Sequence, residues 1–159
     1  MNTLKVGDKA PHFKLVDQDN ELIALSDFQG QKVLLYFYPK AMTPGCTLQA
    51  AGLRDSMEIL RALGITVLGI SSDSPKKLQQ FVEKEMLNFS LLSDSDHQVS
   101  EQFGVWGEKS FMGKQYNGIH RISFLINEQG VIEQVFSAFK PVEHHEHVLR
   151  YLGHYSATP

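Results

Sequence analysis

The chain has 159 residues, of which 42% are hydrophobic and 21% charged, and its formal net charge is −3 at pH 7. These values fit a single folded domain over residues 1–159, and they give no reason to expect a nucleic acid or a membrane as partner. The N-terminus carries no apolar signal segment, and the single cysteine excludes an internal disulfide, so we expect a soluble cytoplasmic protein.

The first half of the chain predicts three strands and a long helix. Residues 12–25 fit two short strands around an Asp-Asn turn, and residues 25–30 fit one helical turn. Residues 32–39, KVLLYFYP, form a continuous apolar run that favours a strand buried on both faces. Residues 44–63 have helical spacing, with one apolar face made of Leu48, Leu53, Met57, Leu60 and Leu63.

The second half again alternates strands with helices and then ends with two consecutive strands and a helix. It predicts strands at 65–71 and 90–94, helices at 74–86 and 95–105, a strand pair in 119–139 and a last helix over 141–155. The inner side of that last helix is expected to hold Val142, Val148, Leu149 and Leu152. Strand–helix–strand–helix followed by a strand pair and a helix predicts an α/β protein with a mixed central sheet and flanking helices.

The only cysteine lies where the apolar strand gives way to the long helix. Thr43 fits the N-cap, Pro44 the first helical position, and Cys46 the first turn, whose backbone N–H groups have no partner within the helix. These donors and the helix dipole favour a thiolate, and Gly45 allows another molecule to approach the backbone closely. A small buried hydrophobic side chain is the competing interpretation of Cys46, and local chemistry alone does not choose between them.

The motif "YPKAMTPGCT", with Pro39, Thr43 and Cys46 at its characteristic positions, resembles the active-site motif of the peroxiredoxins. The segment "HRISFLIN", which contains Arg121, resembles a later strand of that family whose arginine faces the sulfur. The segments "APHFKLVDQDNELIALSDFQGQKVLLYFYP" and "SDSDHQVSEQFGVWGEKSFMGK" resemble the bacterioferritin comigratory protein or peroxiredoxin Q subgroup, so the likeness extends to about residue 152.

This resemblance implies a thioredoxin-like fold and a thiol peroxidase for hydrogen peroxide and alkyl hydroperoxides. It implies that Cys46 attacks the peroxide and becomes a sulfenic acid. It assigns Thr43 to the hydrogen bonds around peroxide and sulfur, Arg121 to charge stabilisation, and Pro39 to shielding the sulfur. It implies no cofactor. Without the motif, each of these residues has an ordinary structural interpretation as a cap, a surface cation or a turn residue.

The chain departs from many members of the subgroup because it lacks a resolving cysteine. Ala51 and Ser100 stand at the two positions where the resemblance leads us to look for one, and the sequence leaves open whether they are natural or replaced. The resemblance therefore implies that an outside thiol, such as thioredoxin, glutaredoxin or glutathione, resolves the sulfenic acid. It also favours a monomer.

Two other features have functional and structural interpretations. The segment 106–118 fits a surface loop anchored by aromatic residues, or a wall of the peroxide pocket formed by Trp106 and Phe111 beside Pro44 and Gly45. His144 and His147 have the spacing of weak metal ligands, but a solvated polar face is the favoured interpretation and no metal is expected. A redox sensor without turnover remains the rival function, whereas thioredoxin-type dithiol chemistry needs a second cysteine.

Overall fold

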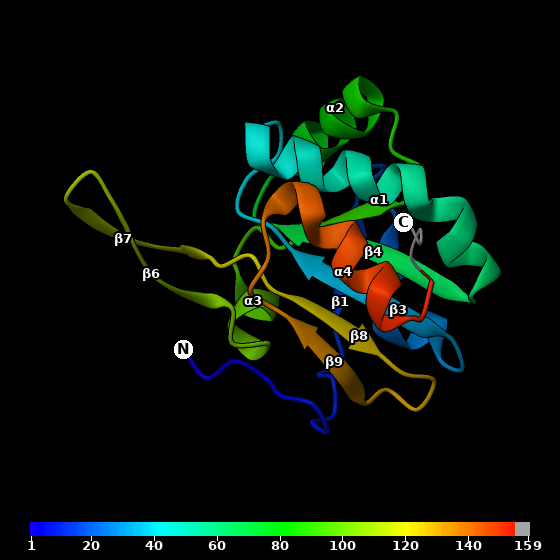
Figure 1. Ribbon diagram of the computed structural model, residues 1–159. Helices are drawn as coiled ribbons and strands as arrows, with labels where there is room; N and C mark the ends of the chain where they lie inside the picture. Colours follow the sequence, from blue (N-terminus) through cyan, green and yellow to red (C-terminus); the bar gives the residue numbers. More distant parts are fainter. Residues whose placement is uncertain (155–159) are drawn as a thin grey trace, which may run out of the picture.

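A mixed seven-stranded sheet forms the centre of the protein in the computed structural model, which describes residues 1–154 (Figure 1). Its strand order is β2-β1-β5-β4-β3-β8-β9. The strands are β1 Lys14–Asp17, β2 Leu22–Ala24, β3 Lys32–Phe37, β4 Ile65–Ser71, β5 Ser90–Ser93, β8 Ser123–Ile126 and β9 Ile132–Phe136. β3, β4 and β5 are parallel and β8 is antiparallel to β3, which confirms the mixed sheet.

Helices cover both faces of this sheet. They are α1 Pro44–Ala62, α2 Pro75–Glu85, α3 Gln98–Gln102 and α4 His144–Tyr151, with 3-10 turns η1 Leu25–Phe28 and η2 Pro141–Glu143. The buried residues divide into two clusters: α1, α2 and α4 pack on one face, and α3 packs on the other with the segment around Phe13. No helix in residues 1–154 is long and apolar enough to cross a bilayer.

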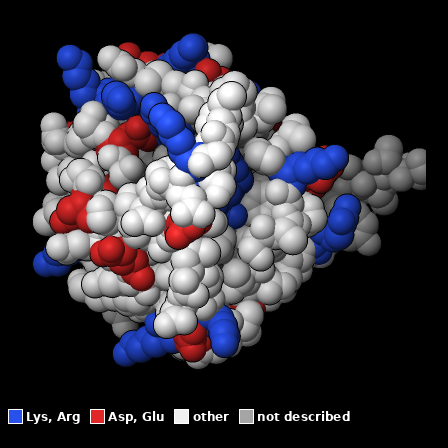
Figure 2. Space-filling model, turned by 90° about the vertical axis from the view of Figure 1, so that its left-hand side faces the viewer, with Lys and Arg blue, Asp and Glu red and all other residues white. Residues whose placement is uncertain are grey.

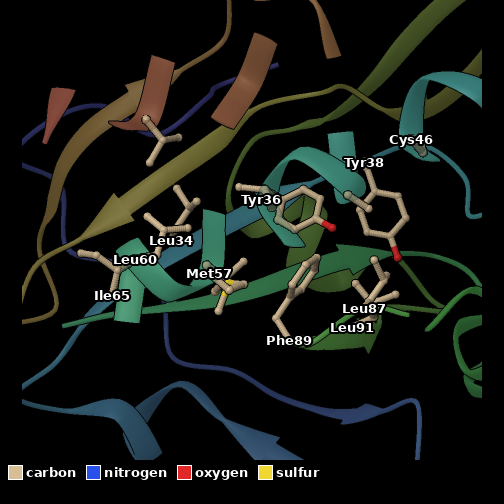
Figure 3. Packing of buried hydrophobic residues seen from close by; sticks show 14 of the residues in the cluster. Leu34, Tyr36, Tyr38, Cys46, Met57, Leu60, Ile65, Leu87, Phe89 and Leu91 are labelled. Carbon is tan, nitrogen blue, oxygen red and sulfur yellow. The ribbon is translucent and has the colours of Figure 1, made fainter. Parts of the chain in front are cut away.

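Strand β3 supplies both clusters because successive side chains of a strand point to opposite faces. Leu34, Tyr36 and Tyr38 point toward α1, while the residues between them point toward α3. Figure 3 shows Tyr36 and Tyr38 on the α1 side, in the same cluster as Cys46. The buried run predicted from KVLLYFYP is therefore a strand covered on both faces.

The predicted apolar faces of the helices are only partly correct. Leu53, Met57 and Leu60 are buried in α1, but Leu48 and Leu63 are 51% and 42% exposed. The buried stripe of α1 instead begins with Cys46 and Ala50, which continue the spacing of three and four residues toward Leu53. Val142 is exposed as well, because it belongs to η2 and precedes the first residue of α4.

The segment 106–118 is a hairpin, so the predicted loop was wrong. β6 Trp106–Phe111 pairs with β7 Lys114–Ile119, and the pair projects from the body of the molecule (Figure 1). The reversal occurs at Met112 and Gly113, both with positive φ, as a tight two-residue hairpin turn requires. The flanking glycines that indicated a loop are compatible with paired strands here.

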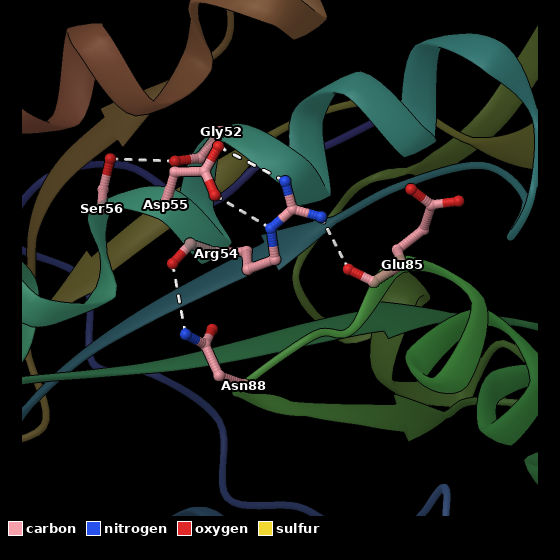
Figure 4. A network of polar contacts seen from close by, with 6 residues as sticks. All are labelled: Gly52, Arg54, Asp55, Ser56, Glu85 and Asn88. Carbon is pink, nitrogen blue, oxygen red and sulfur yellow. Dashed lines mark hydrogen bonds and ion pairs between the residues drawn. The ribbon is translucent and has the colours of Figure 1, made fainter.

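Polar contacts fix the orientation of α1 relative to α2 (Figure 4). The Arg54 guanidinium donates to Asp55 at 2.9 Å and to the Glu85 carbonyl at 2.7 Å, and the Asn88 side chain donates to the Arg54 carbonyl at 3.2 Å. The middle of α1 is thus tied to the C-terminal end of α2. On its other side α1 packs closely against α4, where a Cβ on Gly52 would overlap the His145 imidazole.

We expect Gly52→Ala to destabilise the protein by about 1–3 kcal/mol, because the added methyl group forces α1 and α4 apart. Helix propensity alone predicts the opposite sign, a gain of about 1 kcal/mol. Urea unfolding of Gly52→Ala, beside Glu58→Ala at an exposed position of the same helix, measures the difference. A more stable Gly52→Ala protein would contradict this packing.

Candidate active site

The start of α1 has the predicted backbone but a different hydrogen bond at Thr43. Thr43 is the N-cap in extended conformation, and Pro44 is the first helical residue. The Thr43 hydroxyl makes no cap hydrogen bond and donates instead to the Lys40 carbonyl at 2.7 Å. The predicted N-cap position of Thr43 is therefore confirmed, while its hydroxyl closes the turn that leads into the helix.

A carboxylate just after the neighbouring parallel strand β4 anchors that turn. The Ala41 N–H donates to Asp73 Oδ2 at 2.7 Å, and Ser71 donates to the same oxygen at 2.8 Å. The anchor holds Met42 at φ 64°, a left-handed conformation that costs a residue with a side chain about 1–2 kcal/mol. The sequence analysis missed Asp73, whose only signal was its position just after the strand at residues 65–71.

Cys46 is buried, with 1% of its surface exposed. The sulfur is therefore closed to solvent in this conformation, although Gly45 led us to expect that another molecule can approach the helix start. The space beside Gly45 is already filled: a Cβ there would lie 3.3 Å from Arg121 Nη2 and 3.5 Å from Pro141 Cγ. Gly45 thus allows the Arg121 and Pro141 side chains to approach the helix start, and these two side chains help to cover Cys46.

Arg121 lies against the sulfur although it is distant in sequence. Its Nη1 donates to Cys46 Sγ at 3.4 Å and to Gln49 Oε1 at 2.6 Å. Arg121 precedes Ser123 of β8 by two residues, so both side chains point to the face that α1 covers. Gln49 follows Cys46 by three residues and is fully buried, and the sequence analysis missed it although this spacing places it beside Cys46 on the helix.

Two tyrosine hydroxyls are buried on the same face of the sheet. Tyr36 and Tyr38 have ring centroids 5.4 Å apart, and neither hydroxyl has a hydrogen-bond partner among the described residues. Burial raises the pKa of both tyrosines, so both remain neutral O–H donors at physiological pH. The negative charge of a Cys46 thiolate acts in the same direction on each of them.

A neutral histidine is buried on the same face of the sheet. His144 is fully buried and its Nε2 lies 2.7 Å from Ser123 Oγ. Burial, with smaller contributions from the neighbouring His145 and Arg121 side chains, lowers the pKa of His144 to about 3. The predicted solvated face was wrong for His144, because α4 turns this residue toward Phe139 at 4.6 Å. No three His, Cys, Asp or Glu side chains within residues 1–154 are grouped to hold a metal.

Two of the other predicted pocket residues lie near Cys46, and two lie away from it. Pro39, half-buried, and Pro44, exposed, lie in the connection and first turn that carry Cys46. Trp106 stacks on His97 at 3.9 Å and packs with the cluster on the opposite face of the sheet. Phe111 is 66% exposed near the end of the hairpin. The structure therefore does not bring Trp106 and Phe111 to the sulfur.

Comparison with known sequences identifies close relatives. Residues 6–135 match the model of the AhpC/TSA family. The chain is 68% identical over 152 residues to Peroxiredoxin Bcp of Escherichia coli K12, covering 96% of this chain and 97% of that protein. It is 42% identical over 142 residues to Peroxiredoxin Bcp of Bacillus subtilis 168, covering 89% and 90% of the two chains.

Solved structures similar to this chain are also peroxiredoxins. A mutant of Xylella fastidiosa PrxQ matches with a TM-score of 0.90 and 32% identity, over 96% of this chain and 98% of that one. The bacterioferritin comigratory protein of Xanthomonas campestris matches with a TM-score of 0.83 and 32% identity, over 89% and 90%. These likenesses confirm the thioredoxin-like fold.

We expect Arg121→Ala to slow the oxidation of Cys46 by hydrogen peroxide about tenfold, because the guanidinium no longer donates to the sulfur. Mass spectrometry of the reduced protein after timed exposure to peroxide measures this rate. Arg150→Ala, an exposed arginine of α4, is the control and should react like the unaltered protein. Equal rates for Arg121→Ala and the control would remove Arg121 from the sulfur's environment.

We expect His144 to make the protein less stable as the pH falls from about 6.5 to about 3, because the unfolded chain then binds a proton that the native histidine does not. Its share approaches about 1.4 kcal/mol per pH unit. Urea unfolding across this pH range should show a flatter dependence for His144→Asn. The exposed His12→Asn should retain the original slope, and equal slopes in all three proteins would contradict the assignment.

Proposed function

The chain belongs to the AhpC/TSA family and is a thiol-dependent peroxidase of the Bcp and PrxQ peroxiredoxins, and from this premise we propose that Cys46 is the sulfur that reduces the peroxide. The observation that carries this proposal is the contact of Arg121 with both Cys46 and Gln49 at the start of α1. Cys46 is also the only cysteine of the chain. Hydrogen peroxide and alkyl hydroperoxides are the proposed substrates.

In the proposed first step the Cys46 thiolate attacks one peroxide oxygen. An S–O bond forms while the O–O bond breaks, the sulfur is oxidised to a sulfenic acid, and the second oxygen leaves with a proton as water or an alcohol. Arg121 stabilises the negative charge that develops on the leaving oxygen, and Gln49 holds the guanidinium in place. The Thr43 hydroxyl, which already donates to Lys40, keeps its oxygen as an acceptor for the peroxide proton.

Access to the sulfur requires a local opening. Cys46 is 1% exposed, whereas Met42 and Pro44 on either side of Thr43 are exposed. We propose that the connection from Pro39 to Gly45 moves outward to admit the peroxide and later the resolving thiol. Since the strained Met42 backbone is held by the Asp73 contact, release of that contact is the least costly way to open the site.

Resolution of the sulfenic acid is assigned to an outside thiol. Ala51 lies inside α1, and residues five apart in an intact helix are separated too far along the axis for a disulfide without unwinding. Ser100 is buried in α3, on the opposite face of the sheet, and its hydroxyl donates to Asp94 at 2.7 Å. Thioredoxin, glutaredoxin and glutathione are the proposed reductants.

We further propose that the protein acts as a monomer in the cytoplasm, with residues 1–159 forming one domain. A cytoplasmic location fits an enzyme that depends on a supply of reduced thiols. Within residues 1–154 one seven-stranded sheet and its two covering layers form the body, from which only the β6–β7 hairpin projects, and this supports a single domain. Residues 155–159 of this assignment lie outside the described part of the chain.

The proposal is tested by measuring hydrogen peroxide consumption with each reductant supplied in turn. We expect turnover for the unaltered protein and its loss, by at least about 10²-fold, in Cys46→Ser, because the nucleophile is removed. Mass spectrometry after one equivalent of peroxide should show one added oxygen on Cys46. Equal, slow consumption by both proteins would overturn the proposed role of Cys46, and oxidation without turnover by any thiol would indicate a redox sensor.

A further inference from the structure

Four exposed apolar side chains border the place where Cys46 is covered. Met42 and Pro44 lie in the connection and the first turn that lead to the sulfur. Leu48 of α1 and Val142 of η2 are 51% and 48% exposed. None of the four belongs to either buried cluster of the protein. We call these four residues the apolar rim.

The seam between α1 and η2 lies beside the sulfur. A Cβ on Gly45 would lie 3.5 Å from Pro141 Cγ, so η2 packs directly against the first turn of α1. The same Cβ would lie 3.3 Å from Arg121 Nη2, while Nη1 of this guanidinium donates to Cys46 Sγ at 3.4 Å. A molecule that reaches Cys46 must therefore contact the surface along this seam.

Helix geometry places two residues of the apolar rim along the seam. Leu48 follows Gly45 by three residues and precedes Gly52 by four, and residues at these spacings are neighbours on one side of a helix. Gly45 faces Pro141 and Gly52 faces the start of α4, so Leu48 lies on the same side of α1. Val142 directly follows Pro141 in η2. The two exposed side chains thus border the seam, one from each element.

The fold itself does not require apolar side chains at these positions. The periodicity of the sequence predicted that Leu48 and Val142 are buried, yet both are in contact with solvent and pack in neither cluster. Exposed apolar side chains that gather in one place mark contact with another molecule, and a disagreement between pattern and fold is typical of functional sites. The apolar rim differs from other exposed apolar residues because it borders the only cysteine of the chain.

Two exposed lysines add positive charge beside the apolar rim. Lys40 lies two residues before Met42, and Lys140 lies two residues before Val142. Neither lysine forms an ion pair with a carboxylate in residues 1–154. Figure 2 looks onto the side of the molecule where α1 begins, and it shows uncharged side chains with Lys or Arg side chains beside them. This face is therefore complementary to an apolar surface bordered by negative charge.

We propose that the apolar rim is the docking surface for a protein that supplies the resolving thiol, and that this thiol lies in an apolar surface bordered by acidic side chains. The inference rests on the proposed function of Cys46, and it narrows the outside thiol to one carried by a protein. Cys46 is 1% exposed, so the site must open, and burial of the apolar rim against a partner offsets the cost of opening. A small polar thiol such as glutathione cannot cover both borders of the seam.

The chemical step is balanced with the docked protein as the reductant. Its thiolate attacks the sulfenic sulfur of Cys46, an S–S bond forms, and the S–O bond breaks. The departing hydroxide takes a proton from water or from the incoming thiol and leaves as water. The sulfenic sulfur is reduced and the partner's sulfur is oxidised. A second thiol then attacks the partner's sulfur in the mixed disulfide and releases Cys46 as a thiolate.

The test compares protein thiols with a small thiol. Protein oxidised with one equivalent of hydrogen peroxide is mixed with reduced thioredoxin, reduced glutaredoxin or glutathione, and mass spectrometry follows loss of the sulfenic acid. Rates are divided by the thiolate fraction of each reductant. We expect at least one of the two proteins to react at least about tenfold faster than glutathione, because docking holds its thiol at the sulfur. Added salt should lower this ratio.

Neutral variants of the apolar rim identify the surface. Leu48→Gln should lower the ratio of the protein rate to the glutathione rate about fivefold, and combination with Val142→Thr should lower it at least about tenfold. Leu63→Gln is the matched control, because Leu63 is 42% exposed at the other end of α1, and it should leave the ratio unchanged. Since the ratio is measured within each protein, a general loss of stability or reactivity does not mimic the effect.

Three results would overturn the inference. They are glutathione reacting as fast as both proteins, an unchanged ratio in the double variant, and a dimer of this chain linked through Cys46 as the main product. A ratio that does not respond to salt would overturn the acidic border of the partner. If the unaltered protein forms no sulfenic acid on Cys46, the proposed function fails. A sulfenic acid that forms and is then resolved without regard to the apolar rim overturns the docking surface alone.

Discussion

The contact between the Arg121 guanidinium and the Cys46 sulfur is the interaction on which the site depends. Arg121 Nη1 lies 3.4 Å from Sγ and shares its donors with Gln49, so a permanent charge is fixed where the first turn of α1 meets the sheet. The two elements come together because β8 lies next to β3, and β3 leads directly into α1. The sheet order therefore determines the chemistry of the sulfur.

Burial strengthens the electrostatic interactions of the Cys46 sulfur and also limits the access of other molecules to it. Around the sulfur the protein places neutral groups, including the two tyrosine hydroxyls and His144, and electrostatic interactions are stronger in such surroundings than in water. The same packing leaves Cys46 only 1% exposed. A reaction at this sulfur therefore needs movement, and the connection before α1, where Asp73 accepts from the Ala41 N–H, contains the exposed residues Met42 and Pro44.

The β6–β7 hairpin is exposed at its outer end and joins the body of the protein at its base. Its outer end is exposed at Phe111 and Met112, yet Lys109 folds back along it toward the body. A peroxidase of this family whose chain holds one cysteine depends on a separate thiol to reduce its sulfenic acid.

The sequence by itself determined the order of the main elements, and its resemblance to a family singled out Cys46 as the candidate reactive sulfur. The apolar run at residues 32–39, the Thr43-Pro44 helix start and the spacing of Leu53, Met57 and Leu60 are local signals, and the structure contains each of them. The motif around Cys46 and the segment containing Arg121 indicated the family through resemblance. Periodicity failed at Leu48 and Val142, since it does not say which of several apolar residues a neighbouring element covers.

Only the tertiary structure decided what surrounds the sulfur. Asp73 and Gln49 had only weak local signals, a position after a strand and a helical spacing from Cys46, because their contacts depend on the strand order and on how α1 packs. Trp106 resembled a pocket residue, yet the hairpin pairing places it on the other face of the sheet. Local sequence specifies backbone conformation over a few residues, whereas an active site is assembled from side chains that long-range packing brings together.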